Sequence, residues 1–457
     1  MKRRSFIQSA ALGSAAFAAA PLTGCQPQPQ QGDAPSRFED EFELKEITVE
    51  GLQELLGNGT YGSRQIVELY QKRIEAIDKS GPALNSVIEM NPEALSIADQ
   101  LDKERQEGNI RGPLHGIPVM IKDNIDTADQ MMTTAGSLAL VGSIARQDSW
   151  VARKLREAGA IIMGKTNLSE WANFRSTRSS SGWSSRGGQS RNPYILDRNP
   201  CGSSSGSGAA VSANLCMITI GTETNGSIVC PSNANGIVGI KPTVGLIGRS
   251  GIIPISHTQD TAGPMARTVK DAAFMLGALT GIDPRDARTM ESEGLQYSDY
   301  AQFLDPEGLR GARIGIGRGF MGFHEAVDAV LEEAFEIMKQ MGAELIDIEH
   351  RVNAGNGRDG YNVLLFEFKD GLNKYLAGTD ETISVKSLED LIRFNQENEA
   401  EAMPYFKQEI LVAAQEKGGL DSEEYQTALE NILKGSREEG IDKVMDEYQL
   451  DAIAAPT

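Results

Sequence analysis

Apolar residues recur with a helical period in several parts of this 457-residue chain. Over residues 63–77 the apolar positions are Ile66, Leu69, Tyr70, Ile74 and Ile77. This spacing places the side chains on one face, so the pattern predicts an amphipathic helix. Asn91 and Pro92 resemble an N-cap and first-turn pair, which predicts a helix up to about residue 107. The apolar spacing predicts another helix from Asp148 onward, and mostly helix from 361 to 447.

Short uninterrupted apolar runs lie between the predicted helices and are typical of buried strands. They comprise residues 117–121, 160–163, 312–316, 344–348 and 450–457. Because helix and strand alternate along the chain, we predict an α/β fold with helices on both faces of a sheet. The pattern favours one large domain with a helical insertion late in the chain.

Residues 201–243 follow neither period, because two segments rich in glycine and serine interrupt them. These segments, 202–208 and 222–227, flank an apolar stretch. Glycine is favoured where the backbone approaches another group closely or takes an unusual conformation. Hydroxyls beside exposed backbone N–H groups are the components of a nucleophilic site with an oxyanion hole. We therefore place the candidate chemistry here.

Lys122 lies at the end of the apolar run 117–121 and is a candidate base. A lysine next to a buried strand is exposed to desolvation, which lowers the pKa of an amine. A neutral lysine can accept a proton, whereas an arginine stays charged.

Four motifs resemble the amidase signature family of serine hydrolases. They are GIPVMIKDN around Lys122, GSSSGSGAA, GTETNGSIVCP and GIVGIKPTVGLI. Three further segments, GKTNLSEWANF, GWSSRGGQSRNPY and GIIPISHTQDTAGPMARTVKDAA, look like the bacterial peptide amidase branch of that family. The resemblance extends from about residue 47 to the last residue.

The resemblance implies a single α/β domain, residues 43–457, around a twisted mixed sheet covered by helices on both faces. It implies that Ser227 is the nucleophile, that Ser203 links it to the base Lys122, and that the peptide bond before Ser203 is cis. The backbone N–H groups expected to form the oxyanion hole belong to Thr224, Asn225, Gly226 and Ser227. An acyl-enzyme would form without a cofactor or metal. Because relatives continue beyond the final strand, we expect the C-terminal part of the domain to be missing.

The resemblance also bears on the substrate, which we expect to be a C-terminally amidated peptide. Val229 stands where many relatives have arginine, a residue that binds substrate carboxylates. Its absence favours an apolar or peptide amide over a small acidic one. Asn225 also departs from close relatives, which usually have aspartate or glycine there. A broader aliphatic or aryl amidase of the same family is the alternative.

Two readings from other classes compete with an amidase. Residues 202–206 fit the G-x-S-x-G elbow of esterases, in which Ser204 would act with His257, His324 or His350. The preceding residues do not resemble the strand that this elbow requires. A solute-binding lipoprotein would leave the Lys122, Ser203 and Ser227 set unexplained.

The N-terminus predicts export and lipidation. Residues 1–24 combine an arginine pair, an alanine-rich apolar stretch and a lipoprotein box, which are typical of a twin-arginine signal peptide. Cys25 would be the lipidated residue, and residues 25–42 would form a disordered tether. We therefore expect a periplasmic or cell-surface lipoprotein that contacts the membrane only through this anchor. A net charge of −20 disfavours nucleic acid as a partner.

Three cysteines remain after Cys25, namely Cys201, Cys216 and Cys230. An odd number of thiols without metal-ligand spacing predicts no obligatory disulfide and no metal site. The sequence carries no signal for the oligomeric state.

Overall fold

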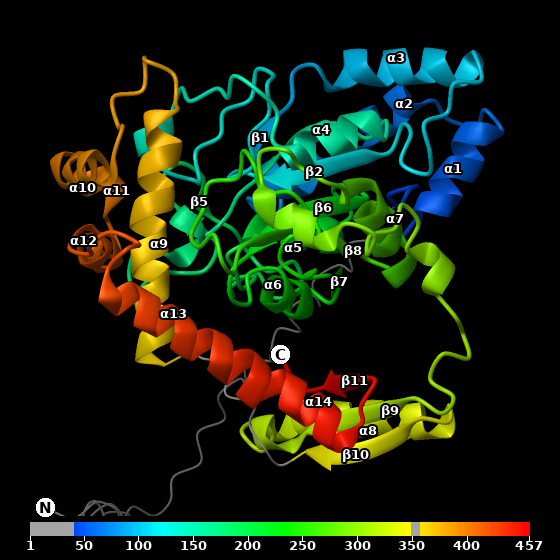
Figure 1. Cartoon of the computed structure of the whole chain (residues 1–457). Coiled ribbons are helices and arrows are strands. Elements are labelled where there is room, and N and C mark those ends of the chain that lie inside the picture. Colours follow the sequence, from blue (N-terminus) through cyan, green and yellow to red (C-terminus); the bar gives the residue numbers. More distant parts are fainter. Residues whose placement is uncertain (1–40, 349–356) are drawn as a thin grey trace, which may run out of the picture. The chain divides into compact units, whose positions relative to one another are not determined.

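A computed structural model describes residues 41–348 and 357–457, and its largest sheet has six strands. They are β1 (Val87–Met90), β2 (Pro118–Lys122), β3 (Ile161–Thr166), β6 (Ile218–Glu223), β7 (Val238–Gly239) and β8 (Thr261–Ala266). Their spatial order is β1–β3–β2–β6–β8–β7 (Figure 1). β2 is parallel to β3 and β6, whereas β1 and β8 are antiparallel to their neighbours. The sheet is therefore mixed, as the family resemblance implied.

The three central strands β2, β3 and β6 are buried along their whole length. Strands covered on both faces are expected to be continuously apolar, which is why β2 and β3 could be predicted from short apolar runs. Lys122 is opposite Thr166, and Ile121 is opposite Ile220. This register brings the end of β2 beside the end of β6, where the second glycine-rich segment begins.

Helices cover the sheet and confirm the helical periods of the sequence. They are α1 (Val49–Gly57), α2 (Ser63–Arg73), α3 (Ala94–Gln106), α4 (Trp150–Glu157), α5 (Ser205–Ser212), α6 (Val229–Ala234) and α7 (Val269–Leu279). A π-helical turn, η1 (Ile74–Lys79), continues α2. α4 packs on β3, α7 packs on β8, and α5 crosses β2, β3 and β6 (Figure 1).

Helix α5 arises from the first glycine-rich segment, which the helical period did not predict. Its glycines allow close approach of neighbouring backbone: a Cβ on Gly206 would lie 2.2 Å from the carbonyl oxygen of Ser86. A Cβ on Gly208 would lie 2.9 Å from Asn235 Nδ2. The glycines therefore fit a buried helix against its surroundings instead of interrupting it.

A second, three-stranded parallel sheet has the order β10–β9–β11. Its strands are β9 (Arg313–Gly317), β10 (Glu344–Ile348) and β11 (Ala452–Ala454), and α8 (Glu325–Gln340) connects the first two. Between β10 and β11 the chain is mostly helical, as predicted. The helices are α9 (Arg358–Ala377), α10 (Leu388–Glu397), α11 (Glu399–Ala402), α12 (Glu409–Gln415), α13 (Glu423–Ser436) and α14 (Asp442–Tyr448).

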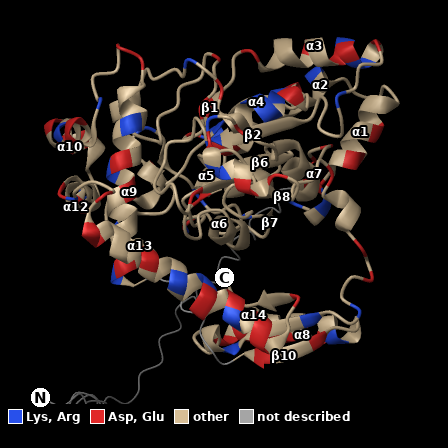
Figure 2. Cartoon of the chain, viewed as in Figure 1, with Lys and Arg blue, Asp and Glu red and all other residues tan. Residues whose placement is uncertain are grey.

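The remaining elements are short. They are the hairpin β4 (Trp183–Ser184) and β5 (Gly188–Gln189), the 3-10 helices η2 (Leu138–Leu140), η3 (Glu170–Asn173), η4 (Ala287–Ser292), η5 (Ala301–Phe303) and η6 (Arg318–Phe320), and the π-helical turn η7 (Arg437–Ile441). Charged residues of both signs are distributed along helices such as α3, α9 and α13 (Figure 2).

Residues Leu44–Thr457 form one unit of the chain. The signal peptide predicted at residues 1–24, the lipidation site Cys25 and the tether up to residue 40 lie outside the described residues. In the part of the chain that is described, no helix has the length and apolar character needed to cross a membrane.

Candidate active site

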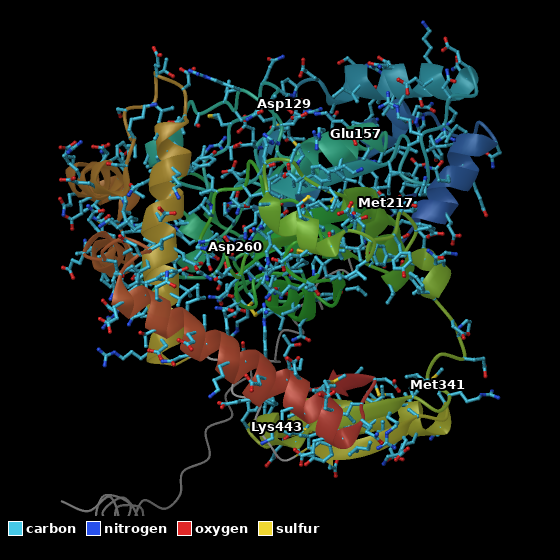
Figure 3. The ribbon with its side chains drawn as sticks, in the orientation of Figure 1. Asp129, Glu157, Met217, Asp260, Met341 and Lys443 are labelled. Atoms are coloured by element: carbon cyan, nitrogen blue, oxygen red, sulfur yellow. A yellow bond between two sulfur atoms is a disulfide. The ribbon has the colours of Figure 1, made fainter. Side chains whose placement is uncertain are left out.

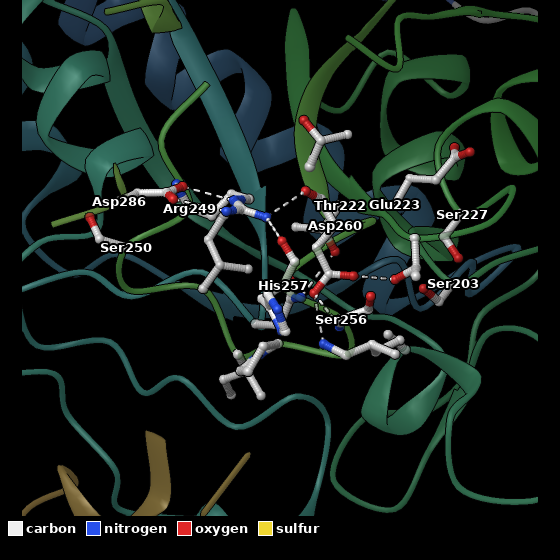
Figure 4. Close-up of a pocket in the computed structure, with 18 of the residues that line it drawn as sticks. Ser203, Thr222, Glu223, Ser227, Arg249, Ser250, Ser256, His257, Asp260 and Asp286 are labelled. Carbon is white, nitrogen blue, oxygen red and sulfur yellow. Dashed lines mark hydrogen bonds and ion pairs between the residues drawn. The ribbon is translucent and has the colours of Figure 1, made fainter. Parts of the chain in front are cut away.

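A cavity of about 210 Å³ opens where β2, β6 and the loop before β8 meet (Figure 4). Ser203 and Ser227 lie at one end of it, and Ile252, Ile253 and Ile255 contribute an apolar wall. The other lining residues are Asn124, Ala172, Thr222, Glu223, Thr224, Arg249, Ser250, Pro254, Ser256, His257, Asp260, Thr261, Arg285 and Asp286. Val229, which entered the substrate prediction, does not line this cavity.

Lys122 is buried directly behind the cavity, at the end of β2. Its Nζ lies 2.8 Å from Ser203 Oγ, 2.9 Å from Thr222 Oγ1 and 3.2 Å from the Thr222 carbonyl oxygen. Burial lowers the pKa of Lys122 to about 7, although the charges of Asp260 and Glu223 act in the opposite direction. Much of the amine is therefore neutral at physiological pH, as the sequence predicted.

The three neighbours of Nζ match the needs of a neutral amine, which has two N–H donors and one lone pair. The Thr222 carbonyl oxygen can only accept a hydrogen bond, and the Thr222 hydroxyl has two lone pairs. That hydroxyl also accepts a hydrogen bond from Asn124 Nδ2 at 3.0 Å. When both N–H groups are directed to Thr222, the lone pair is left for the Ser203 hydroxyl. Lys122 is thus arranged to take a proton from Ser203.

Ser203 and Ser227 come from the two glycine-rich segments and lie side by side in the cavity (Figure 4). The peptide bond between Gly202 and Ser203 is cis, as the resemblance implied. The segments are joined by a hydrogen bond from Ser204 N to the Ser227 carbonyl oxygen, at 3.1 Å. Ser203 is fully buried, and Ser227 Oγ has no hydrogen-bond partner among the described residues. The Ser227 hydroxyl is therefore free to meet a ligand.

The carboxylate of Glu223 holds the backbone around Ser227. It accepts hydrogen bonds from the N–H groups of Gly226 at 2.7 Å, Ile228 at 2.6 Å and Val229 at 3.0 Å. One expected oxyanion donor must therefore be corrected, because the Gly226 N–H already has an acceptor inside the protein. Sequence analysis missed Glu223 although it lies in the motif, since nothing in the motif shows that its side chain turns back on its own loop.

The other three expected donors remain open. Within the described residues, the N–H groups of Thr224, Asn225 and Ser227 have no protein acceptor. Thr224 is fixed from two sides, because Thr224 Oγ1 donates to Asp260 Oδ1 at 2.5 Å and Lys241 Nζ donates to its carbonyl oxygen at 3.1 Å. Thr224 and Ser227 line the cavity, and Asn225 lies between them in the loop. Backbone donors beside a free hydroxyl can stabilise an oxyanion.

Asp260, whose place in the chain is labelled in Figure 3, ties the cavity wall to this loop (Figure 4). Its second carboxylate oxygen accepts from the N–H groups of Ile255 and Ser256, each at 2.8 Å. Desolvation raises the pKa of Asp260 from its ordinary value. The same wall is held from α9 by Glu367, which accepts hydrogen bonds from Ser256 Oγ and, at 3.0 Å, from Thr258 Oγ1. Asp260 lies in the segment 251–273 that resembles the family, and Glu367 lies in α9, but no sequence pattern shows that either side chain reaches this wall.

The geometry does not support the esterase reading. Ser204 is buried and does not line the cavity. Its Oγ donates to the Thr222 carbonyl oxygen at 3.1 Å and accepts from Thr222 N at 3.2 Å. His257 does line the cavity, but its Nδ1 lies 3.5 Å from Glu367 Oε2. Ser204 is thus occupied in holding the end of β6.

The expectation of no obligatory disulfide must be corrected, because Cys201 and Cys230 are bonded to each other. Cys201 precedes the cis peptide bond, and Cys230 lies in α6 shortly after Ser227. Sequence spacing could not show this pairing, since the fold of β6 brings the two segments together. Cys216 is a buried free thiol whose pKa burial raises to about 12. Among the described residues, no cluster of histidine, cysteine or acidic side chains could hold a metal ion.

Fold and site together define an amide hydrolase of the amidase signature type. A family model described as "Amidase" matches residues 65–457, and the chain belongs to this family. It resembles the native peptide amidase from Stenotrophomonas maltophilia with a TM-score of 0.88 and 47% identity, over 91% of this chain and 85% of that one.

Two other similar proteins are also described as amidases. An amidase family protein from Bacillus anthracis has a TM-score of 0.84 and 36% identity, covering 90% of this chain and 81% of that chain. A probable amidase from Arabidopsis thaliana, At4g34880, is 43% identical over 428 residues, which are 91% of this chain and 81% of the relative.

Proposed function

We propose that this amidase hydrolyses carboxamides through Ser227, Ser203 and Lys122. Neutral Lys122 accepts the proton of Ser203, and Ser203 accepts the proton of Ser227. The Ser227 oxygen then bonds to the amide carbon, and the carbonyl electrons move to the oxygen, which the backbone N–H groups of Thr224, Asn225 and Ser227 stabilise. The observation that carries this proposal is the 2.8 Å contact between a buried, largely neutral lysine and Ser203.

The leaving group departs by the reverse proton transfer. When the tetrahedral intermediate collapses, the C–N bond breaks and the nitrogen takes the proton of Ser203, which regains one from Lys122. Ammonia leaves, and an ester between Ser227 and the acyl group remains. Water then attacks this ester with the same relay as base, which releases the acid and restores the Ser227 hydroxyl. All protons are returned, so no cofactor is needed.

We further propose that the substrates are C-terminally amidated peptides. The similarity to the Stenotrophomonas peptide amidase supports this, as does the apolar wall beside the two serines. A cavity of about 210 Å³ suits a terminal –CONH₂ and one side chain better than a continuing chain. Internal peptide bonds would then be spared, because the residues beyond the scissile bond would clash.

Incubation with amidated dipeptides, simple aliphatic amides and unmodified peptides tests the substrate class. Mass spectrometry should show a gain of about one mass unit for amidated peptides only, the result of replacing NH₂ by OH. Exclusive turnover of aliphatic amides would favour the broader amidase instead. Internal cleavage fragments would contradict the peptide amide proposal.

The nucleophile is tested by Ser227→Ala, which should lower kcat by several orders of magnitude and abolish labelling by a fluorophosphonate. Ser250→Ala is a matched control, because Ser250 lines the same cavity but its hydroxyl donates to Asp283. The Ser250→Ala variant should keep the wild-type kcat and should still be labelled by the fluorophosphonate. A wild-type protein that is not labelled would instead favour the solute-binding alternative.

A further inference from the structure

Lys241 contacts the site from outside, and neither the relay nor the pocket uses it. Its Nζ donates a hydrogen bond to the carbonyl oxygen of Thr224 at 3.1 Å. Its side chain is exposed, and among the described residues it has no carboxylate partner. A lysine on a backbone carbonyl, without an ion pair, requires an explanation from what that carbonyl does.

The contacted carbonyl belongs to the peptide bond between Thr224 and Asn225. This peptide bond is trans, so its C=O and N–H groups point in opposite directions. With Lys241 on the carbonyl side, the Asn225 N–H points to the opposite side, and it has no protein acceptor within the described residues. The lysine therefore fixes the orientation of one of the three open donors.

The positive charge of Lys241 also acts on the Thr224–Asn225 peptide group, in addition to orienting it. A cation at a carbonyl oxygen withdraws electrons from the peptide group and makes its N–H a better donor, since chained hydrogen bonds polarise one another. The backbone beside Lys241 is anchored, because Ile240 N donates to the Pro264 carbonyl oxygen at 3.0 Å. The exposed lysine side chain thus extends from a fixed base on the edge of the sheet.

We infer that Lys241 is a positioning residue for amide hydrolysis: it orients and polarises the Thr224–Asn225 peptide group so that Asn225 N–H stabilises the oxyanion. This inference rests on the proposed function, because it requires Ser227 to generate that oxyanion. It assigns an electrostatic role in the reaction to the GIVGIKPT segment, which contains β7 and ends just beyond it.

Lys241→Met tests the role, since methionine keeps most of the side-chain stem and loses the charge. Full loss of one oxyanion donor lowers kcat by about 100-fold or more, so loss of its polarisation should lower kcat by about tenfold. KM for an amidated dipeptide should stay within about threefold, because the ground-state carbonyl carries little charge. Lys241→Arg restores a cationic donor and should recover kcat to within about threefold of the wild type.

An inhibitor pair separates this role from a structural one. A peptide aldehyde forms a hemiacetal with the serine and places an oxygen in the oxyanion position, whereas the corresponding peptide alcohol cannot. Lys241→Met should weaken the aldehyde about tenfold and leave the affinity for the alcohol unchanged. Lys270→Met is the control, because Lys270 is half exposed, pairs with Glu50 at 2.6 Å and does not line the cavity.

Several results would overturn the inference. They are an unchanged kcat in Lys241→Met, equal weakening of aldehyde and alcohol, or a Lys241→Arg variant as impaired as Lys241→Met. Failure of the proposed function would look different, because the Ser227→Ala variant would then keep the activity of the wild type. Ser227-dependent turnover with a normal Lys241→Met variant refutes the role of Lys241 alone.

Discussion

Replacing Asn124 by aspartate would place a negative charge near buried Lys122 with almost no change in side-chain size. Asn124 is buried and reaches the lysine through one atom, Thr222 Oγ1, to which both side chains donate. Aspartate cannot donate to that oxygen, but its charge stabilises the protonated amine. The variant therefore changes the proton affinity of the base and leaves the base itself in place.

The size of the effect follows from the distance. Hydrogen bonds of 3.0 and 2.9 Å share Thr222 Oγ1, so the new charge lies at most about 6 Å from Nζ. At an effective dielectric constant of about 20, two unit charges at that distance interact by about 3 kcal/mol, or about two pKa units. The pKa of Lys122 should thus rise from about 7 toward about 9.

The assay is the pH dependence of kcat/KM for an amidated dipeptide. The protonated lysine is inactive, so the wild-type rate should rise with pH through about 7 and then level off. In Asn124→Asp the midpoint should move upward by one to two units, on the order of the charge interaction above, with loss of activity at pH 7. Asn124→Ala loses the same hydrogen bond without adding a charge, so its midpoint should stay near 7. Equal midpoints in wild type and Asn124→Asp would refute the assignment of the base.

Three further predictions concern other parts of the chain. Lys122→Arg should be as inactive as Lys122→Ala in the ammonia-release assay, because arginine stays protonated; an active arginine variant would contradict the neutral-lysine role. Cys201→Ser should lower the free energy of unfolding in a denaturant titration by about 3 kcal/mol, since the bond to Cys230 closes a loop with a sequence separation of 29; an unchanged midpoint would show that the bond does not constrain the unfolded chain. Cys25→Ala should move the protein from the membrane fraction to the soluble fraction on immunoblots, because the lipid anchor is lost; persistence in salt-washed membranes would refute the lipidation site.

Much of the fold could be predicted because the relevant signals are local. The run ending at Lys122 is apolar at every position, as a strand buried on both faces must be, and the structure has it as β2. Helix α2 follows from the period of its apolar face, and α3 follows from the Asn91-Pro92 pair that precedes it. The two serines could be named from the resemblance to the amidase signature family, and Lys122 also from its place after a buried strand.

The parts that sequence analysis missed depend on contacts between distant segments. Cys201 meets Cys230 only after β6 and α6 have folded against α5. The Gly226 N–H donates to Glu223 because of the rotamer of that glutamate, which no motif encodes. Asp260 reaches Thr224 across the sheet, so its role follows from tertiary packing alone. The glycine-rich helix α5 was missed because its glycines serve close packing, which local propensity counts as unfavourable.

The buried amine of Lys122 also links folding to proton release. Its pKa is about 7 in the native protein and 10.5 in the unfolded chain, so between these pH values folding expels a proton into the solvent. The native state therefore gains stability as the pH rises from 7 to 10.5, and below pH 7 it carries the full penalty, on the order of 5 kcal/mol. That penalty is comparable to the net stability of a typical domain. Any substitution that increases the proton affinity of this amine will strengthen the fold and weaken the enzyme at neutral pH.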